Sequence, residues 1–193
     1  MAVKKGVVKR SPVLVNAWLY GVAIAVFLLP LLVMEVLKQS GRLLGPLFVL
    51  YLALNVILIF LSIMYYLGFV YLGQKAGMKM LVFSSFFMMG AASLSFFFGM
   101  LTLLNASFDV FIYEAATLVI VGAGSMVFGI SLFGLEDVFG RIARVAGLLN
   151  IVAGFLYMTV ILAVVGFLFF IAASVVEIIL LYKASKFSYR KAK

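Results

Sequence analysis

Glu177 is the one acidic residue of this sequence that lies clearly inside a long apolar tract, five positions before the tract ends at Tyr182. A carboxyl group at such a depth in a membrane costs about 2.5 to 3.5 kcal/mol, so an acid that is kept there is a candidate for proton or ion binding. If the tract folds back near residue 164, positions whose numbers sum to about 327 lie at equal depth in the two helices. This register predicts that Asn150 lies opposite Glu177.

Three roles are open for this pair. In the first, Asn150 and Glu177 form a hydrogen bond that locks a terminal helical hairpin, with the carboxyl neutral because burial disfavours its charged form. In the second, Glu177 is an ion or proton site in a transport path, and in the third it pairs with a Lys or Arg of a neighbouring subunit. We favour the first role, since proton pathways need several ionisable groups in series and no second buried carboxylate or histidine continues one.

Three further acids, Glu35, Asp109 and Glu114, cluster on the predicted outer side, near the ends of the first and fourth spans. Asp109 is suited to cap the N-terminus of the fourth span, and Glu114 in its first turns complements the helix dipole. The functional alternative is a vestibule that attracts cations.

The connection between the fourth and fifth spans, residues 134–147, carries apolar residues at helical spacing and charges on another face. This pattern predicts an interfacial helix, with Asp137 and Arg141 as an i,i+4 ion pair and Arg144 on the same charged face. The alternative is that Glu136 and Asp137 form a catalytic or metal-binding pair. We favour the interfacial helix, because adjacent carboxylates on a helix point about 100° apart.

Histidine and cysteine are both absent from the sequence. Their absence removes the usual ligands of zinc, copper, haem and iron–sulfur clusters, together with the commonest general base and the thiol nucleophile. Paired intramembrane Asp residues are missing as well. We therefore expect neither an enzyme nor a bound metal or cofactor.

The composition requires a membrane environment, because 67% of the 193 residues are hydrophobic and only 11% are charged. A helix of about 20 apolar residues crosses a bilayer core. The last apolar tract, 145–182, would form a rod of about 57 Å, so we expect it to turn near Val164, Val165 and Gly166. The sequence thus predicts one all-α integral membrane domain over 1–193, a bundle with spans at about 12–36, 46–72, 79–104, 110–133, 145–163 and 165–182.

Positive charge gives the orientation, because Lys and Arg accumulate in short cytoplasmic segments. With both termini in the cytoplasm of a cell-membrane protein, the six-span arrangement leaves only Lys38 and Arg42 outside. The other thirteen basic residues fall inside: Lys4, Lys5, Lys9, Arg10, Lys75, Lys79, Arg141, Arg144, Lys183, Lys186, Arg190, Lys191 and Lys193. The net charge of +9 then indicates contact with anionic inner-leaflet lipids of the bilayer, and not with nucleic acid.

Aromatic and small residues complete the pattern. Trp and Tyr favour the headgroup boundary, so we expect Tyr51 and Tyr113 to anchor the outer face. Anchors of the inner face would be Trp18, Tyr20, Tyr65, Tyr66, Tyr71 and Tyr182. In the fourth span, small residues that permit close helix contact predict a packing element rather than a pore lining: Gly122, Gly124, Ser125 and Gly129.

Short motifs recur at the ends of the even spans: Leu72-Gly73 and Leu135-Glu136 at the turns, Gly140-Arg141-Ile142 before the fifth span, and Val176-Glu177-Ile178 in the sixth. With these motifs, residues 60–186 resemble archaeal multi-spanning membrane proteins of unknown function. The resemblance implies a source and an architecture, but no chemistry.

Two functions are open. We favour a non-catalytic accessory, assembly or scaffold subunit that acts through its helix surfaces on other membrane subunits or on further copies of itself, because the loops are minimal and one acid is buried. The alternative is a small ion or proton-coupled transporter or channel that uses Glu177.

Overall fold

The fold was analysed in a computed structural model, which describes residues 11–40, 45–104 and 110–186. Over these residues the chain is 92% helical and has no strands, and six of its helices are long and apolar enough to cross a membrane. The prediction of an all-α, six-span bundle is confirmed. The helices are α1 (Pro12–Gln39), α2 (Pro46–Ala76), α3 (Lys79–Leu104), α4 (Val110–Phe133), α5 (Glu136–Phe139), α6 (Arg141–Met158) and α7 (Ala163–Lys186).

Local sequence explains where the helices begin and end. Pro12 and Pro46 occupy the first turns of α1 and α2, where their missing N–H groups leave no helical hydrogen bond unmade. Gly77 ends α2 at a left-handed φ of 70°, and the N–H of Met78 donates to the carbonyl of Gly73 at 2.8 Å. This glycine-terminated motif turns the chain directly into α3.

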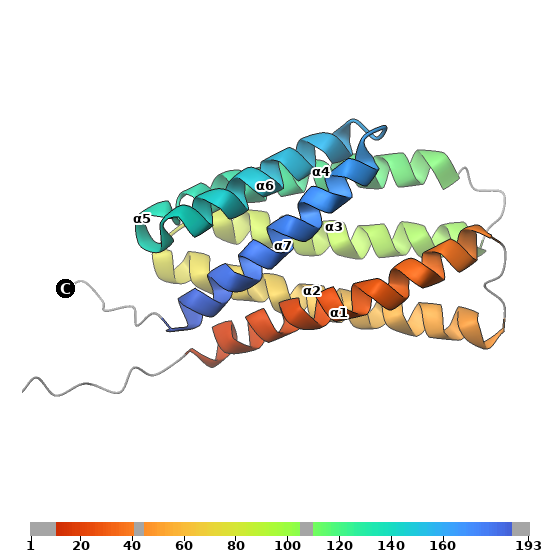
Figure 1. Ribbon diagram of the computed structural model, residues 1–193, viewed down its shortest axis with the longest axis horizontal. Coiled ribbons are helices and arrows are strands. Elements are labelled where there is room, and N and C mark those ends of the chain that lie inside the picture. The colour runs from red at the N-terminus through yellow and green to blue at the C-terminus, as the bar shows by residue number, and fades with distance from the viewer. Residues whose placement is uncertain (1–10, 41–44, 105–109, 187–193) are drawn as a thin grey trace, which may run out of the picture.

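The six long helices form a closed ring in chain order, because each packs on the next and α1 packs on α7 (Figure 1). The start of α1 and the end of α7 lie at the same end of the bundle, with the α2–α3 turn and α5. The described basic residues at this end, which we call the basic end, are Lys75, Lys79, Arg141, Arg144, Lys183 and Lys186. That the basic end faces the cytoplasm is a prediction from charge.

The turn between α6 and α7 lies earlier than we expected. It occupies residues 159–162, whereas Val164, Val165 and Gly166 are inside α7, so the predicted position was wrong. Thr159 begins the turn by donating its hydroxyl to the carbonyl of Leu156 at 2.7 Å. Gly166 serves helix contact instead, because a Cβ there would lie 3.1 Å from the side chain of Leu156.

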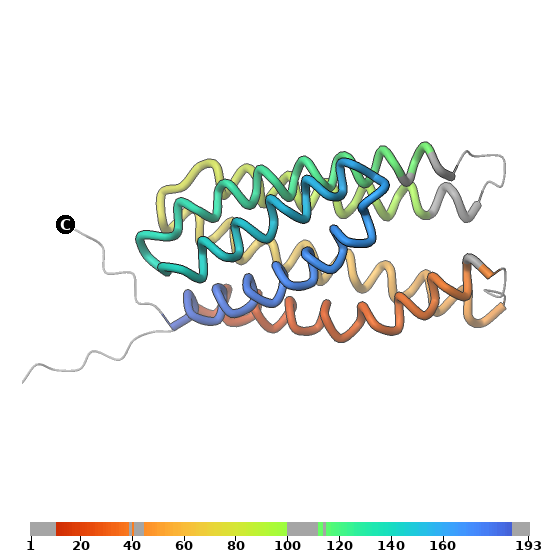
Figure 2. Tube along the Cα trace, turned by 45° about the horizontal axis from the view of Figure 1, so that its top comes forward, coloured from red at the N-terminus to blue at the C-terminus, as the bar shows by residue number. Residues whose placement is uncertain are grey.

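The α6–α7 hairpin is also shorter than its neighbours. Figure 2 shows that its turn stops well before the ends of α1 and α2, so α1 to α4 alone form this end of the bundle. We call it the cavity end, because residues near it, among them Glu35 and Lys38, line the cavity described below.

The half of the bundle toward the basic end is densely packed. Phe69 and Phe128 are fully buried and meet edge to face, with ring centroids 5.1 Å apart. Tyr66 packs edge to face on Phe128 at 5.5 Å. Tyr65 and Tyr66 are 4% and 6% exposed, so the prediction that these two residues anchor a membrane surface was wrong. Their rings contribute to the core instead.

The small residues of the fourth span pack as predicted. A Cβ on Gly122 or Gly129 of α4 would lie 2.6 Å from the carbonyl oxygen of Gly154 or Gly147 of α6, respectively. The two backbones are therefore in contact at two levels, one on each side of Ser125.

The predicted interfacial helix over 134–147 is divided. Gly140, with a φ of 66°, separates α5 from α6, and Arg141 is the first residue of α6. Within the described residues, the ion pair of this segment joins Arg144 to Glu136 at 3.6 Å, in place of the predicted pair of Asp137 and Arg141. The break at Gly140 explains the change, because it interrupts the continuous helix that an i,i+4 pair needs.

Candidate functional site

Glu177 lies at the centre of a buried hydrogen-bond network in the densely packed half of the bundle. The Nδ2 group of Asn150 donates to Oε1 of Glu177 at 2.5 Å, and the hydroxyl of Tyr65 donates to Oε2 at 2.8 Å. Asn150 and Glu177 are 1% and 3% exposed. The contact predicted between Asn150 and Glu177 is thus present, whereas the partnership with Tyr65 was not predicted.

The network extends to a fourth helix. Asn150 also donates to the carbonyl of Ala146 at 2.9 Å, and the hydroxyl of Ser125 lies 3.0 Å from the carbonyl oxygen of Asn150. Both carboxylate oxygens of Glu177 therefore have donors, and the network connects α2, α4, α6 and α7. We call Tyr65, Ser125, Asn150 and Glu177 the buried lock.

A separate cavity of about 590 Å³ occupies the cavity end of the bundle. Its walls come from α1 to α4, with Phe170 of α7 on one side. Glu177 does not line it. The lining reaches Val121 at the middle of α4, and on α2 it reaches Tyr66, about two thirds of the way from Pro46 to Ala76. The cavity therefore extends deep into the bundle from the cavity end.

One face of α2 gives the cavity a polar wall. Tyr51, Asn55, Ser62 and Tyr66 follow one another at helical spacing and all line it, over about 22 Å of helix. The hydroxyls of Ser62 and Tyr66 make no side-chain hydrogen bond within the part of the chain that the structure describes. Hydroxyls inside a protein normally have hydrogen-bond partners. These two hydroxyls can therefore form hydrogen bonds with a molecule that enters the cavity.

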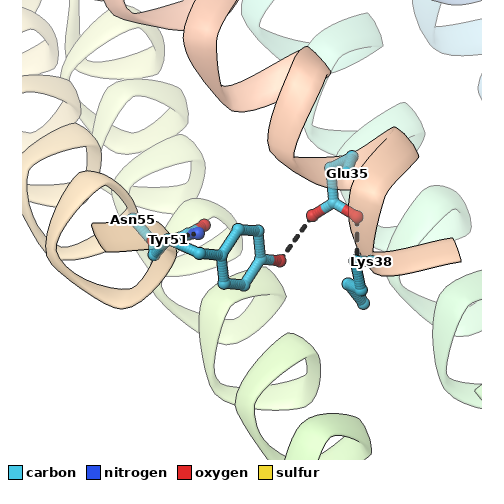
Figure 3. Close-up of polar contacts among 4 residues, drawn as sticks. All are labelled: Glu35, Lys38, Tyr51 and Asn55. Carbon is cyan, nitrogen blue, oxygen red and sulfur yellow. Dashed lines mark hydrogen bonds and ion pairs between the residues drawn. The ribbon is translucent and has the colours of Figure 1, made fainter. Parts of the chain in front are cut away.

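Glu35 of α1 lines this cavity near the cavity end of the bundle, at a place we call the cavity mouth. Figure 3 shows it between Tyr51 and Lys38. Its Oε1 accepts a hydrogen bond from the Tyr51 hydroxyl at 2.5 Å, and its Oε2 lies 3.2 Å from the Lys38 ammonium. The same ammonium is 5.7 Å from the centre of the Tyr51 ring. The carboxylate of Glu35 and the ring of Tyr51 thus both lie close to the ammonium group of Lys38.

The structure tests only part of the predicted outer acidic cluster. Glu35 is placed at the cavity mouth. Asp109 and the side chain of Glu114 lie outside the described residues. Among the described residues, no group of three or more acids could hold a metal ion.

The polar face of α2 was missed in the sequence, although a pattern for it exists. Asn55 and Ser62 are seven positions apart, and Tyr51 and Tyr66 extend the same helical face in both directions. Treating the tyrosines as surface anchors hid this periodicity.

No protein-family model matches the chain, and no curated protein or solved structure matches it. The resemblance over residues 60–186 therefore stays a prediction. Fold and composition define the class: this is a multi-pass helical membrane protein.

Proposed function

We propose that this protein is a non-enzymatic transport protein of the cell membrane, which receives a small solute in the cavity. One observation carries the proposal: a largely apolar cavity of about 590 Å³, with a row of polar side chains along α2, extends deep into the bundle as far as Tyr66. Solute sites of transporters characteristically lie near the bilayer midplane between packed helices. A cavity that reaches deep into the bundle and stops at packed aromatic rings fits one state of alternating access.

The densely packed half of the bundle, toward the basic end, supports this function as the closed half of the transport path. Beyond Tyr66 the path is filled by the rings of Phe69 and Phe128, and the buried lock holds α2, α4, α6 and α7 together beside them. In this proposal Glu177 does not bind the solute. It stabilises the closed half, and its two hydrogen bonds must break when that half opens.

The test is solute flux in proteoliposomes, with protons, sodium, potassium and a panel of labelled cationic, zwitterionic and neutral organic solutes. The cavity is blocked by Ala92→Trp, since Ala92 lines it. The matched control is Gly90→Trp on the same helix, where a Cβ has nothing within 4 Å. We expect a flux that Ala92→Trp abolishes and Gly90→Trp retains. If no member of the panel moves, or if both variants behave alike, the proposal is wrong.

An accessory or scaffold subunit is the second candidate. The observation in its favour is that both oxygens of Glu177 are occupied by donors, as in a purely structural lock. Native co-purification with a larger membrane complex, together with absence of flux, would support this role over transport.

A further inference from the structure

We propose that the cavity mouth binds the ammonium group of an organic cation whose apolar body lies in the cavity. The inference rests on the proposed function for the use of the cavity, and it adds the chemical class of the solute. The site consists of the Glu35 carboxylate and the Tyr51 ring, with Lys38 as the group that a ligand displaces.

The arrangement already holds an ammonium group. The Nζ atom of Lys38 lies 3.2 Å from one oxygen of Glu35 and within cation–π distance of Tyr51. The Tyr51 hydroxyl donates to the other carboxylate oxygen at 2.5 Å and thereby fixes the orientation of the carboxylate. An ammonium ion therefore finds a positioned anion and an aromatic face at one point.

Lys38 can leave this position. It lies in the last turn of α1, which ends at Gln39, and its ammonium is carried on a flexible four-carbon stem. The side chains of Lys38 and Glu35 are 23% and 34% exposed, so a solute in the mouth can reach both. An incoming ammonium would take the place of the lysine without leaving Glu35 unpaired.

The rest of the cavity indicates what the cation carries. Leu58, Ile59 and Phe96 line the cavity between the mouth and the bottom, and they favour an apolar body. At the bottom lies Tyr66, which is 6% exposed and has no side-chain hydrogen bond among the described residues. Its hydroxyl offers a hydrogen bond to the far end of a long ligand.

Equilibrium binding to the purified full chain in nanodiscs tests the inference, with empty nanodiscs as the blank. The probes share one ring and differ in charge: 2-phenylethylammonium, the neutral 2-phenylethanol and zwitterionic phenylalanine. We expect the ammonium compound to bind the wild type at least about tenfold more tightly than the alcohol, as a charge-assisted contact requires. Equal binding of these two probes would overturn the inference without the use of any variant.

Two variants separate a cation from a zwitterion. Glu35→Gln should weaken binding of 2-phenylethylammonium about tenfold or more, whereas Lys38→Met should strengthen it about two- to fivefold by removing the competing charge. If phenylalanine binds more tightly than 2-phenylethylammonium, and if Lys38→Met abolishes this binding, the solute is a zwitterion and the cation assignment is wrong. Charge-selective binding without flux would contradict the proposed transport function but leave the cation site standing. Flux without charge-selective binding would contradict the cation site but leave the transport function standing.

Discussion

The hydroxyl of Tyr65 on α2 donates a hydrogen bond of 2.8 Å to the carboxylate of Glu177 on α7, across 112 positions of the sequence. Its neighbour Tyr66 lies at the bottom of the cavity. Two consecutive tyrosines thus have separate roles, because successive side chains on a helix point about 100° apart. Tyr65 joins α2 to α7 in the densely packed half of the bundle, and Tyr66 lies at the bottom of the cavity.

This difference predicts that Tyr65→Phe is more destabilising than Tyr66→Phe. Loss of the Tyr65 hydroxyl removes one of the two donors to Glu177 inside the bundle, at a cost of about 0.5 to 1.5 kcal/mol in the free energy of unfolding. Tyr66 is the matched control, since its hydroxyl has no hydrogen bond among the described residues. Unfolding in mixed micelles at increasing denaturing detergent gives both values, and equal losses would contradict the role of the lock.

Close backbone contact between α4 and α6 predicts that Gly129→Ala is destabilising. The new Cβ would lie 2.6 Å from the carbonyl oxygen of Gly147, and a backbone atom moves aside only if the helices separate. We expect a loss of about 1 to 3 kcal/mol, which is typical of overpacking. Gly90→Ala is the control and should be neutral or slightly stabilising, because nothing lies within 4 Å of its Cβ. Thermal unfolding of the two variants in the same detergent would compare them, and an unchanged midpoint for Gly129→Ala would argue against the contact.

The sequence predicted the fold well because each span needs only length and apolar composition, properties that individual residues carry. It also predicted the Asn150–Glu177 contact, although it placed the turn at Val164–Gly166 instead of residues 159–162.

The cavity was beyond prediction for a different reason. It depends on which face of α2 meets the hollow between α1, α3 and α4, and on the short α6–α7 hairpin. Apart from the polar face of α2, the helices are apolar on nearly all sides and give no amphipathic pattern from which their relative rotation can be deduced. Tyr65 illustrates the difficulty, since its partner Glu177 lies on a helix that is distant in the sequence.

The backbone conformation of Val160, in the turn between α6 and α7, leads us to predict that its replacement by glycine is stabilising. It is the non-glycine residue with a positive φ, 58°, among the described residues, and a β-branched side chain is strained there. Val160→Gly should raise the free energy of unfolding by up to about 1 kcal/mol, since relief of strain exceeds the added freedom of the unfolded chain. The neighbouring Ile161 is 91% exposed without a positive φ, so Ile161→Gly should give no such gain. The same detergent unfolding experiment checks both, and a loss of stability in Val160→Gly would show that the turn is unstrained.

The asymmetry of basic residues predicts which end of the bundle faces the cytoplasm, and the absence of cysteine from the chain makes the measurement direct. Single cysteines would be placed at Ser40, an exposed residue of the cavity end, and at Lys79, an exposed residue of the basic end. A membrane-impermeant maleimide should label Ser40→Cys in intact cells and Lys79→Cys only after permeabilisation, because Lys and Arg are retained on the cytoplasmic side. The reverse pattern would leave the fold intact but invert the orientation. The cavity would then open to the cytoplasm, and the proposed solute would be one that the cell exports.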